Sequence, residues 1–179
     1  NLERGHRRNL EVRKFESSKV REFEKELVCP LIVGDLRNAA EIEKAMMGAK
    51  PDAVMHFAAY ALVGESMADP MMYFRNNVGG GGNLLAAMEK AGCSRIIFSS
   101  TCATYGQPET LPIEETMPQR PTNPYGQSKL MFEQMCGWCE KVREFEGSKV
   151  QGLRATFLRY FNAVGAALGM VEDHDPETH

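Results

Sequence analysis

Tyr125 and Lys129 stand four positions apart in the segment Asn123-Pro-Tyr-Gly-Gln-Ser-Lys129. Asn123 suits a helix N-cap and Pro124 the first helical position, which predicts that Tyr125 and Lys129 lie one turn apart on one helix face. A free phenol has a pKa of about 10, which is too high for a base at neutral pH. A nearby ammonium group favours the phenolate and lowers this pKa. The spacing therefore predicts a tyrosine tuned as a general base.

A run of hydroxyl side chains comes before this segment, at Ser99-Ser-Thr-Cys-Ala-Thr-Tyr-Gly106. It follows an apolar stretch that is typical of a strand, and in parallel sheets ligands bind where loops leave the carboxyl ends of the strands. Thr101 is predicted to pass a substrate proton to Tyr125. The Tyr-x-x-x-Lys spacing alone is common on solvated helices. Its combination with a hydroxyl-rich strand exit favours a catalytic site.

Strand-like and helix-like segments alternate along the chain and must position these residues. Apolar strand patterns occupy residues 30–35, 52–59, 95–100 and 153–162. Helical patterns occupy residues 39–47, 69–90 and 123 to about 145. Strands that are apolar on both faces and alternate with helices predict a parallel sheet covered on both sides, which is a doubly wound α/β fold. Residues 1–28 interleave charged and sparse apolar residues and predict a charged connector with one helix near residues 20–27.

Composition excludes several classes of protein. The chain has 179 residues, of which 43% are hydrophobic and 25% charged, as in globular proteins. No apolar run approaches the roughly 20 residues of a membrane span, and the net charge of -3 argues against a nucleic-acid partner. Five scattered cysteines and no secretory pattern favour a cytoplasmic location. Cys136 and Cys139 share a predicted helix face and are interpreted as buried thiols, with a redox or metal pair as the alternative.

Four consecutive glycines, Gly79–Gly82, occupy a position that the pattern assigns to a helix. Each costs about 1 kcal/mol of helix stability relative to alanine, so something must require them. Close packing of a soft helix is the favoured interpretation, and direct contact with a phosphate is the alternative. No Gly-x-Gly-x-x-Gly spacing is present, and no predicted strand directly precedes the run.

Six segments together resemble the extended short-chain dehydrogenase/reductase family, and within it the UDP-hexose 4-epimerases. They follow in the family's order and cover most of the chain from about Val33 onward. The segments are His56–Ser66, Tyr73–Gly80, Ser99–Gly106, Asn123–Lys129, Leu158–Ala166 and Val171–His179. The resemblance implies a Rossmann-like fold, tightly bound NAD, and an isomerase that interconverts UDP-galactose and UDP-glucose through a 4-keto intermediate.

The resemblance also implies a role for individual residues. Tyr125 removes the proton of the sugar 4-hydroxyl, Thr101 is its hydrogen-bond partner, and Lys129 holds the nicotinamide ribose and tunes Tyr125. Further NAD contacts are implied for Asn1, Asp35, Leu36, Phe57, Ala58, Ala59, Asn76 and Phe161. Contacts with the UDP-sugar substrate are implied for Ser66 and Asn162, besides Thr101 and Tyr125. A homodimer is expected through the helix that carries Tyr125 and Lys129, and no metal is expected.

The ends of the chain lead us to expect a fragment. A dinucleotide-binding fold needs a first strand and a Gly-rich turn, and neither precedes Asn1. We expect residues 1–28 to follow a truncated second strand, residues 29–165 to be a partial NAD-binding domain, and residues 166–179 to begin the substrate-binding region. By themselves, residues 1–179 are expected to retain NAD weakly or not at all and to show no turnover.

Alternative functions remain open at this stage. They are another nucleotide-sugar epimerase or a dehydratase of the same family, an inactive truncated product, and a non-catalytic nucleotide-binding scaffold. Dehydratases of the family carry Asp-Glu directly after the strand-end threonine, whereas Cys102 and Ala103 stand here. A scaffold has no need for the combination of Thr101, Tyr125 and Lys129. Both observations favour the epimerase.

Overall fold

The computed structural model describes residues 31–141 and 152–163. All helices and strands in these ranges belong to one compact unit, Gly34–Ala163. The other unit comprises residues 1–33 and 164–179 and is described only at residues 31–33. Several predictions therefore lie outside the described residues: the charged connector with its helix, the NAD contact from Asn1, the helix beyond residue 141, and the beginning of the substrate-binding region.

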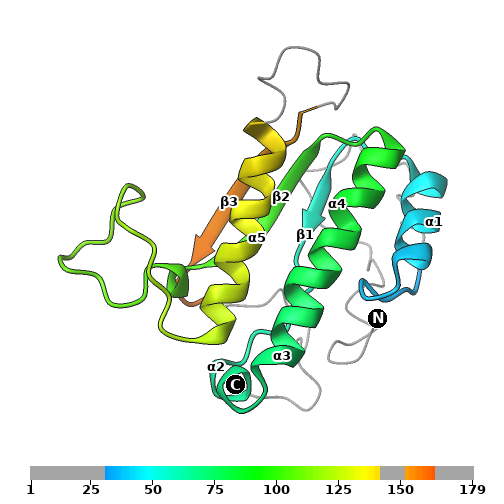
Figure 1. The fold of residues 1–179 in the computed structure, drawn as a ribbon. Helices are drawn as coiled ribbons and strands as arrows, with labels where there is room; N and C mark the ends of the chain where they lie inside the picture. The colour runs from blue at the N-terminus through cyan, green and yellow to red at the C-terminus, as the bar shows by residue number, and fades with distance from the viewer. Residues whose placement is uncertain (1–30, 142–151, 164–179) are drawn as a thin grey trace, which may run out of the picture. The chain divides into compact units, whose positions relative to one another are not determined.

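Three parallel strands form the sheet of this unit (Figure 1). They are β1 (Val54–His56), β2 (Arg95–Thr101) and β3 (Arg154–Tyr160), in the order β1-β2-β3. β2 is the central strand, where Ile96 pairs with Val54 on one side and Ala155 on the other. Parallel strands with helices between them confirm the predicted Rossmann-like α/β class.

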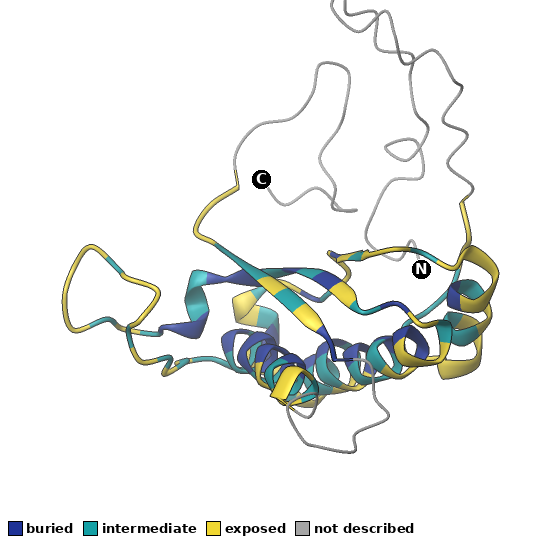
Figure 2. Ribbon diagram, turned by 90° about the horizontal axis from the view of Figure 1, so that it is seen from above, coloured by how far each residue is buried: buried dark blue, intermediate teal, exposed yellow. Residues whose placement is uncertain are grey.

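Helices pack on one face of this sheet (Figure 2). They include α1 (Ala39–Ala49), α4 (Gly80–Ala91) and α5 (Pro124–Lys141). Ile96 and Phe98 of β2 meet Met88 of α4 and Phe132 of α5 in the core between the layers. Within the described part of the chain, no helix is long and apolar enough to cross a membrane. Cover on the second face of the sheet stays a prediction.

The predicted helix over residues 69–90 is divided in the structure. It consists of α3 (Pro70–Tyr73), the π-helical segment η2 (Phe74–Gly79) and α4. The Asp69 carboxylate caps its start by accepting from the Met72 backbone N–H at 3.0 Å. Gly92 ends it in the left-handed conformation, with φ of 72°. The residues that begin and end this helix were thus predictable, and the π-helical segment was not.

Two features differ from the prediction. Residues 31–34 form no strand, and Leu31, Ile32 and Val33 are exposed. An apolar run favours a strand only where a neighbouring strand accepts its hydrogen bonds, and none pairs with this run among the described residues. The short helix α2 (Val63–Ala68) was not predicted, because six residues are too few to show a helical period.

Cys136 is fully buried against the sheet and Cys139 is half-buried, and both are free thiols. Burial raises the pKa of the Cys136 thiol to about 12, so it remains protonated at neutral pH. The structure thus supports the packing interpretation for Cys136. In the part of the chain that the structure describes, no group of three or more potential metal ligands is present.

The glycine run is explained by close packing at its two middle positions. A Cβ atom on Gly80 would lie 2.9 Å from the Leu36 Cβ, and one on Gly81 would overlap the ring of Phe132. Phe132 is fully buried between α5 and the sheet, so it cannot move aside. Gly79, by contrast, has no atom nearer than 3.9 Å to such a Cβ. The run therefore lets α4 approach Leu36 and α5 closely.

This difference predicts opposite effects for one substitution at two neighbouring positions. Gly81→Ala should lower the free energy of unfolding by about 1–3 kcal/mol, because overpacking against Phe132 outweighs the gain in helix propensity. Gly79→Ala should raise it by about 0.5–1 kcal/mol, because there the propensity gain is unopposed. Urea unfolding of both variants measures this. A stabilised Gly81→Ala protein would contradict the packing explanation.

Candidate active site

The structure brings Thr101, Tyr125 and Lys129 together at the carboxyl edge of the sheet. Thr101 is the last residue of β2, and Tyr125 is the second residue of α5. The Thr101 side chain lies close enough to the Tyr125 phenol to lower its pKa. The Nζ of Lys129 lies 5.9 Å from the centre of the Tyr125 ring and donates to the Ser99 carbonyl at 2.8 Å. The sequence prediction for this cluster agrees with its geometry.

Lys129 is an interior cation. Its side chain is only 3% exposed, and its Nζ lies 4.7 Å from the centre of the Phe98 ring. Burial lowers the pKa of Lys129 to about 8, and the carboxylate of Glu133 opposes this shift. The group therefore remains mainly an ammonium ion at neutral pH. A buried charge held this way is typical of a functional site.

The environment of Tyr125 bears on the predicted tuning by Lys129. Burial raises the pKa of Tyr125 above its ordinary value, and the neighbouring Cys102 adds to this, while the Thr101 side chain lowers it. Lys129 was expected to lower this pKa, but it directs a hydrogen bond to the Ser99 carbonyl instead. In the chain by itself Tyr125 is thus a protonated phenol, and the tuning expected from Lys129 together with bound NAD stays a prediction.

The first turn of α5 is seated on the segment that follows Thr101. This segment is η3 (Cys102–Thr104), a single 3-10 turn in which the Ala103 N–H donates to the Thr101 Oγ1 at 3.2 Å. Asn123 caps α5 as predicted, because its Oδ1 accepts from the Gly126 N–H at 2.8 Å. A Cβ on Gly126 would lie 2.6 Å from the Ala103 carbonyl oxygen. This close approach sets the position of Tyr125 relative to Thr101.

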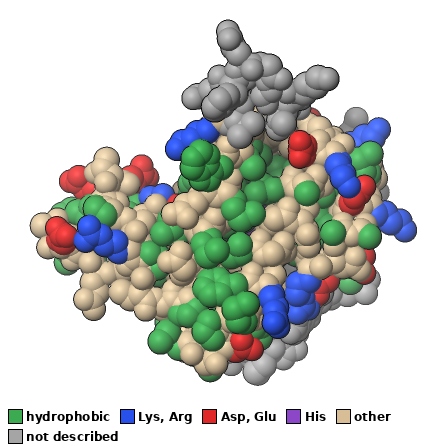
Figure 3. Space-filling model, viewed as in Figure 1, with side chains coloured by type: hydrophobic (Ala, Val, Ile, Leu, Met, Phe, Trp, Pro, Cys, Tyr) green, Lys and Arg blue, Asp and Glu red, His purple; other side chains and the backbone are tan. Residues whose placement is uncertain are grey.

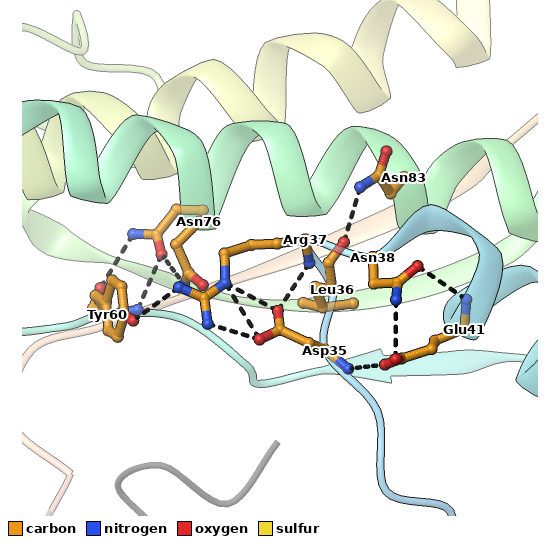
Figure 4. Close-up of polar contacts among 9 residues, drawn as sticks. Asp35, Leu36, Arg37, Asn38, Glu41, Tyr60, Asn76 and Asn83 are labelled. Carbon is orange, nitrogen blue, oxygen red and sulfur yellow. Dashed lines mark hydrogen bonds and ion pairs between the residues drawn. The ribbon is translucent and has the colours of Figure 1, made fainter.

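The residues predicted to contact the adenine side of NAD lie before α1 (Figure 4). The Asp35 carboxylate is paired with Arg37, with 2.6 Å between Nη2 and Oδ2. The Leu36 carbonyl accepts from Asn83 Nδ2 at 2.8 Å, which ties this segment to α4. The Arg37 guanidinium also reaches the Tyr60 hydroxyl, at 3.5 Å. The structure thus links this segment to the exit of β1.

Apolar side chains follow β1 and β3 at the same edge of the sheet. Phe57 and Ala58, directly after β1, are exposed, and Ala59 is half-buried. Phe161, directly after β3, is 66% exposed, and Asn162 beside it is exposed as well. These residues stand at strand exits, and their contacts with NAD and substrate stay predictions.

An asparagine that sequence reasoning missed joins this edge to α5. The predicted contact residue Asn76 is half-buried and donates to Asn77 Oδ1 at 3.0 Å. Asn77 is buried, accepts from the Tyr60 N–H at 2.9 Å, and donates to the Tyr60 carbonyl at 3.0 Å and the Ser128 Oγ at 2.9 Å. Its signal in the sequence was an Asn-Asn pair inside a helix, where asparagine is unfavourable without such a partner.

Ser66 is the predicted residue that the structure does not bring to the site. It is fully buried on α2, and its Oγ donates to the Val63 carbonyl at 2.7 Å. A hydroxyl that is enclosed and bonded within its own helix does not present itself to a substrate. The structure therefore argues against the substrate contact expected from Ser66.

His56 is an interior histidine at the end of β1. Its ring stacks on Phe98 at 5.3 Å and meets the edge of Phe132 at 5.2 Å. Burial, with a smaller effect of the Lys129 charge, lowers the pKa of His56 from 6.5 to about 4. The imidazole is therefore neutral at pH 7, in agreement with the predicted structural role.

This shift predicts acid destabilisation that depends on one residue. The unfolded chain binds a proton on His56 below pH 6.5, and the folded chain does so only near pH 4. The free energy of unfolding should therefore fall by about 3 kcal/mol through His56 as the pH decreases across this window. In His56→Leu this contribution should vanish, while the other three histidines remain. Equal pH dependence of the two proteins in urea unfolding would contradict it.

Comparison with known proteins gives consistent similarities. The profile described as the NAD dependent epimerase/dehydratase family matches residues 2–178. A UDP-glucose 4-epimerase of Lacticaseibacillus casei is 47% identical over 150 residues, covering 82% of this chain and 42% of that protein. The corresponding protein of Streptococcus mutans is 51% identical over 132 residues, and the match covers 72% of this chain and 37% of that protein. The chain spans about two fifths of the length of these curated relatives.

Solved structures agree with these similarities. The UDP-glucose 4-epimerase from Brucella ovis, in complex with NAD, superimposes with a TM-score of 0.75 at 47% identity. That match covers 83% of this chain and 44% of the other. The enzyme from Bifidobacterium longum, in complex with NAD+ and UDP, gives a TM-score of 0.70 at 40% identity, covering 80% and 42%.

Proposed function

Because the chain belongs to the NAD dependent epimerase/dehydratase family, we propose that it forms the catalytic centre of an NAD-dependent UDP-hexose 4-epimerase. The reaction is the interconversion of UDP-galactose and UDP-glucose through a 4-keto sugar, in the cytoplasm. The observation that carries the proposal is the meeting of Thr101, Tyr125 and Lys129 at one strand exit, where Lys129 is anchored by its hydrogen bond to the Ser99 carbonyl.

In this proposal Tyr125 accepts the proton of the sugar 4-hydroxyl, and Thr101 provides the hydrogen bond that aligns the two oxygens. Since burial keeps Tyr125 protonated in the chain alone, the phenolate needs positive charge beside it. Lys129 contributes one such charge. NAD, when bound, supplies a positively charged ring and the acceptor for the hydride of C4. Tyr125 then returns the proton when the sugar is reduced again on its other face.

The residues at the strand exits fit this cofactor. Phe57, Ala58 and Phe161 expose apolar surface beside the cluster, as the flat faces of a nicotinamide ring require. Asp35 offers a carboxylate at the segment joined to the β1 exit through Arg37 and Tyr60. The contacts proposed for Asp35 and Leu36 are with the adenine side of NAD. For Asn162, which is exposed beside Phe161, the proposed contact is with the sugar nucleotide.

The dehydratase alternative has less support at this site. It requires acidic side chains directly after Thr101, where η3 carries Cys102 and Ala103. Ala103 is committed to packing, because its carbonyl oxygen is the atom that Gly126 approaches. The epimerase needs no further acid at this position, since Tyr125 alone exchanges the proton with the sugar.

The proposed activity is tested in a chimera in which residues 34–163 replace the equivalent segment of the Lacticaseibacillus casei relative. We expect this protein to convert UDP-galactose to UDP-glucose in an assay coupled to UDP-glucose oxidation. The relative itself is the positive control, and Lys129→Met in the chimera is the negative one. A chimera that folds and retains NAD but produces no UDP-glucose would contradict the proposal.

The homodimer expected through α5 also belongs to this proposal. Hydrophobic side chains gather along α5 and over α2 and α3 on one face (Figure 3). Trp138 of α5 is 67% exposed, and Met67 and Met71 are exposed near its other end. Light scattering of the purified protein tests this: twice the mass of one chain supports the dimer, and a single mass contradicts it.

A further inference from the structure

Glu133 is a buried carboxylate that the proposed reaction does not use. It lies one turn after Lys129 on α5 and is only 4% exposed. The Ser100 Oγ donates to its Oε1 at 2.5 Å, and Gln119 Nε2 donates to its Oε2 at 3.1 Å. Arg159 of β3 completes the shell, with 2.8 Å between Nη2 and Oε2 and 3.1 Å between Nε and Oε1. All its partners come from other segments of the chain.

Arg159 is held as firmly as its partner. Its Nη1 donates to the Tyr105 hydroxyl at 2.5 Å, and its guanidinium lies 5.2 Å from the centre of the Tyr105 ring. The hydrogen bonds to Glu133 raise the pKa of Arg159 above its ordinary value. The two residues therefore form a charged pair between α5 and β3, behind the catalytic cluster.

The last three residues of β2 are each held by a different turn of α5. The three contacts are Thr101 with Tyr125, the Ser99 carbonyl with Lys129, and Ser100 with Glu133. Because these α5 residues follow one another at intervals of four, one face of the helix contacts the strand end at three points. Loss of one contact would allow the helix to shift against the other two.

Stability alone does not explain why a protein keeps a buried ion pair. Replacing such a pair by apolar residues is often neutral or stabilising, because both charges lose their hydration. Here Glu133 and a second buried cation, Lys129, are one turn apart on the same face of α5. The carboxylate raises the pKa of Lys129, against the effect of burial.

We propose that Glu133 is a positioning residue, which holds the end of β2 in register with α5 and keeps Lys129 in its ammonium form, while Arg159 limits this charge effect. The inference rests on the proposed function, because it explains how the cation beside Tyr125 is maintained. The pair of Glu133 and Arg159 thus acts on Tyr125 indirectly, through the charge of Lys129.

Two other titratable groups lie near Lys129: His56 of β1, which interacts with its charge, and Tyr125 of α5, whose ring centre is 5.9 Å from its Nζ. Around Tyr125 stand Cys102 of η3 and Tyr73 of α3, whose hydroxyl donates to Glu65 of α2. His56 is neutral at pH 7 because its pKa is about 4, and burial keeps Tyr125 protonated. The charge that acts on Lys129 near neutral pH is therefore that of Glu133, which is itself paired with Arg159.

The test is a pH titration of Lys129 in the 179-residue chain, followed by NMR of 13C-labelled lysine side chains and assigned with Lys129→Arg. In Glu133→Gln the midpoint should fall by about one pH unit, as for the loss of a nearby opposite charge. In Arg159→Gln it should rise, because the carboxylate is no longer neutralised. Glu140→Gln, an exposed position on the same helix, should leave it unchanged.

A charge effect moves the Lys129 midpoint in opposite directions in the two variants, whereas a merely structural effect does not. Shifts of the same sign, or no shift in Glu133→Gln, would overturn the inference. If Glu133→Gln does not fold, Arg159→Gln decides: a higher Lys129 midpoint supports the inference, and an unchanged or lower one overturns it. If neither variant folds, Glu133 and Arg159 serve stability alone, and the inference is overturned. The titration needs neither substrate nor NAD, so its outcome is independent of the epimerase assay.

Discussion

Tyr125→Phe is expected to lower the rate of UDP-galactose conversion by about 10²–10⁴-fold, the usual contribution of a positioned general base. The substitution removes one oxygen and retains the ring, which meets the edge of Tyr73 at 6.4 Å. Since the proton of the 4-hydroxyl then has no acceptor, kcat should fall and the substrate KM should change little. Steady-state kinetics of the chimera with and without the substitution measure this.

The folded state serves as the control for this variant. The phenol is buried and protonated, so its loss should leave the thermal unfolding midpoint and the amount of retained NAD close to those of the parent protein. A rate within a factor of about three of the parent would exclude Tyr125 as the base, since a factor this small is below any general-base contribution. A rate that falls together with NAD retention would show a binding role instead.

Gly126→Ala is expected to lower kcat by about 100-fold without unfolding the protein, because displacement of a catalytic group by about 1 Å can cost this much. Its Cβ would lie 2.6 Å from the Ala103 carbonyl oxygen, which is backbone and cannot rotate away. The first turn of α5 must therefore move from η3, and Tyr125 moves with it relative to Thr101.

The same helix provides a matched control for this prediction. Gly137 also lies on α5, and a Cβ there would meet no atom within 4 Å. Gly137→Ala should keep the full rate and gain up to about 1 kcal/mol in stability from helix propensity. Equal rates in the two variants would show that the contact between Gly126 and Ala103 does not position Tyr125.

The parts of the fold that were predictable are those that depend on local chemistry. Asn123 and Pro124 signalled the beginning of α5, and Gly92 signalled the end of α4, because capping acts within a few residues. The apolar runs of β2 and β3 were recognised correctly because each has a neighbouring strand that accepts its hydrogen bonds. The run at residues 31–34 has the same composition but no partner strand among the described residues, so composition alone misjudged it.

The meeting of Thr101, Tyr125 and Lys129 was predictable for a similar reason. Tyr125 and Lys129 are related by one helical turn, and Thr101 by the rule that ligands bind at strand ends. The opposite shift in the pKa of Tyr125 was not predictable, since it depends on burial and on the direction of the Lys129 ammonium group. Ser66 looked like a polar site residue in sequence, and only its burial on α2 shows otherwise.

The sequence by itself determined the family, the α/β class and the three residues proposed to carry the chemistry, because these depend on short spacings and on segment order. The tertiary structure alone decided why the glycine run is needed, how Asn77 joins β1 to α5, and that Glu133 and Arg159 lie behind Lys129. These features depend on contacts between residues that are 17 to 51 positions apart. No local pattern encodes such distances, because packing of the helices on the sheet creates them.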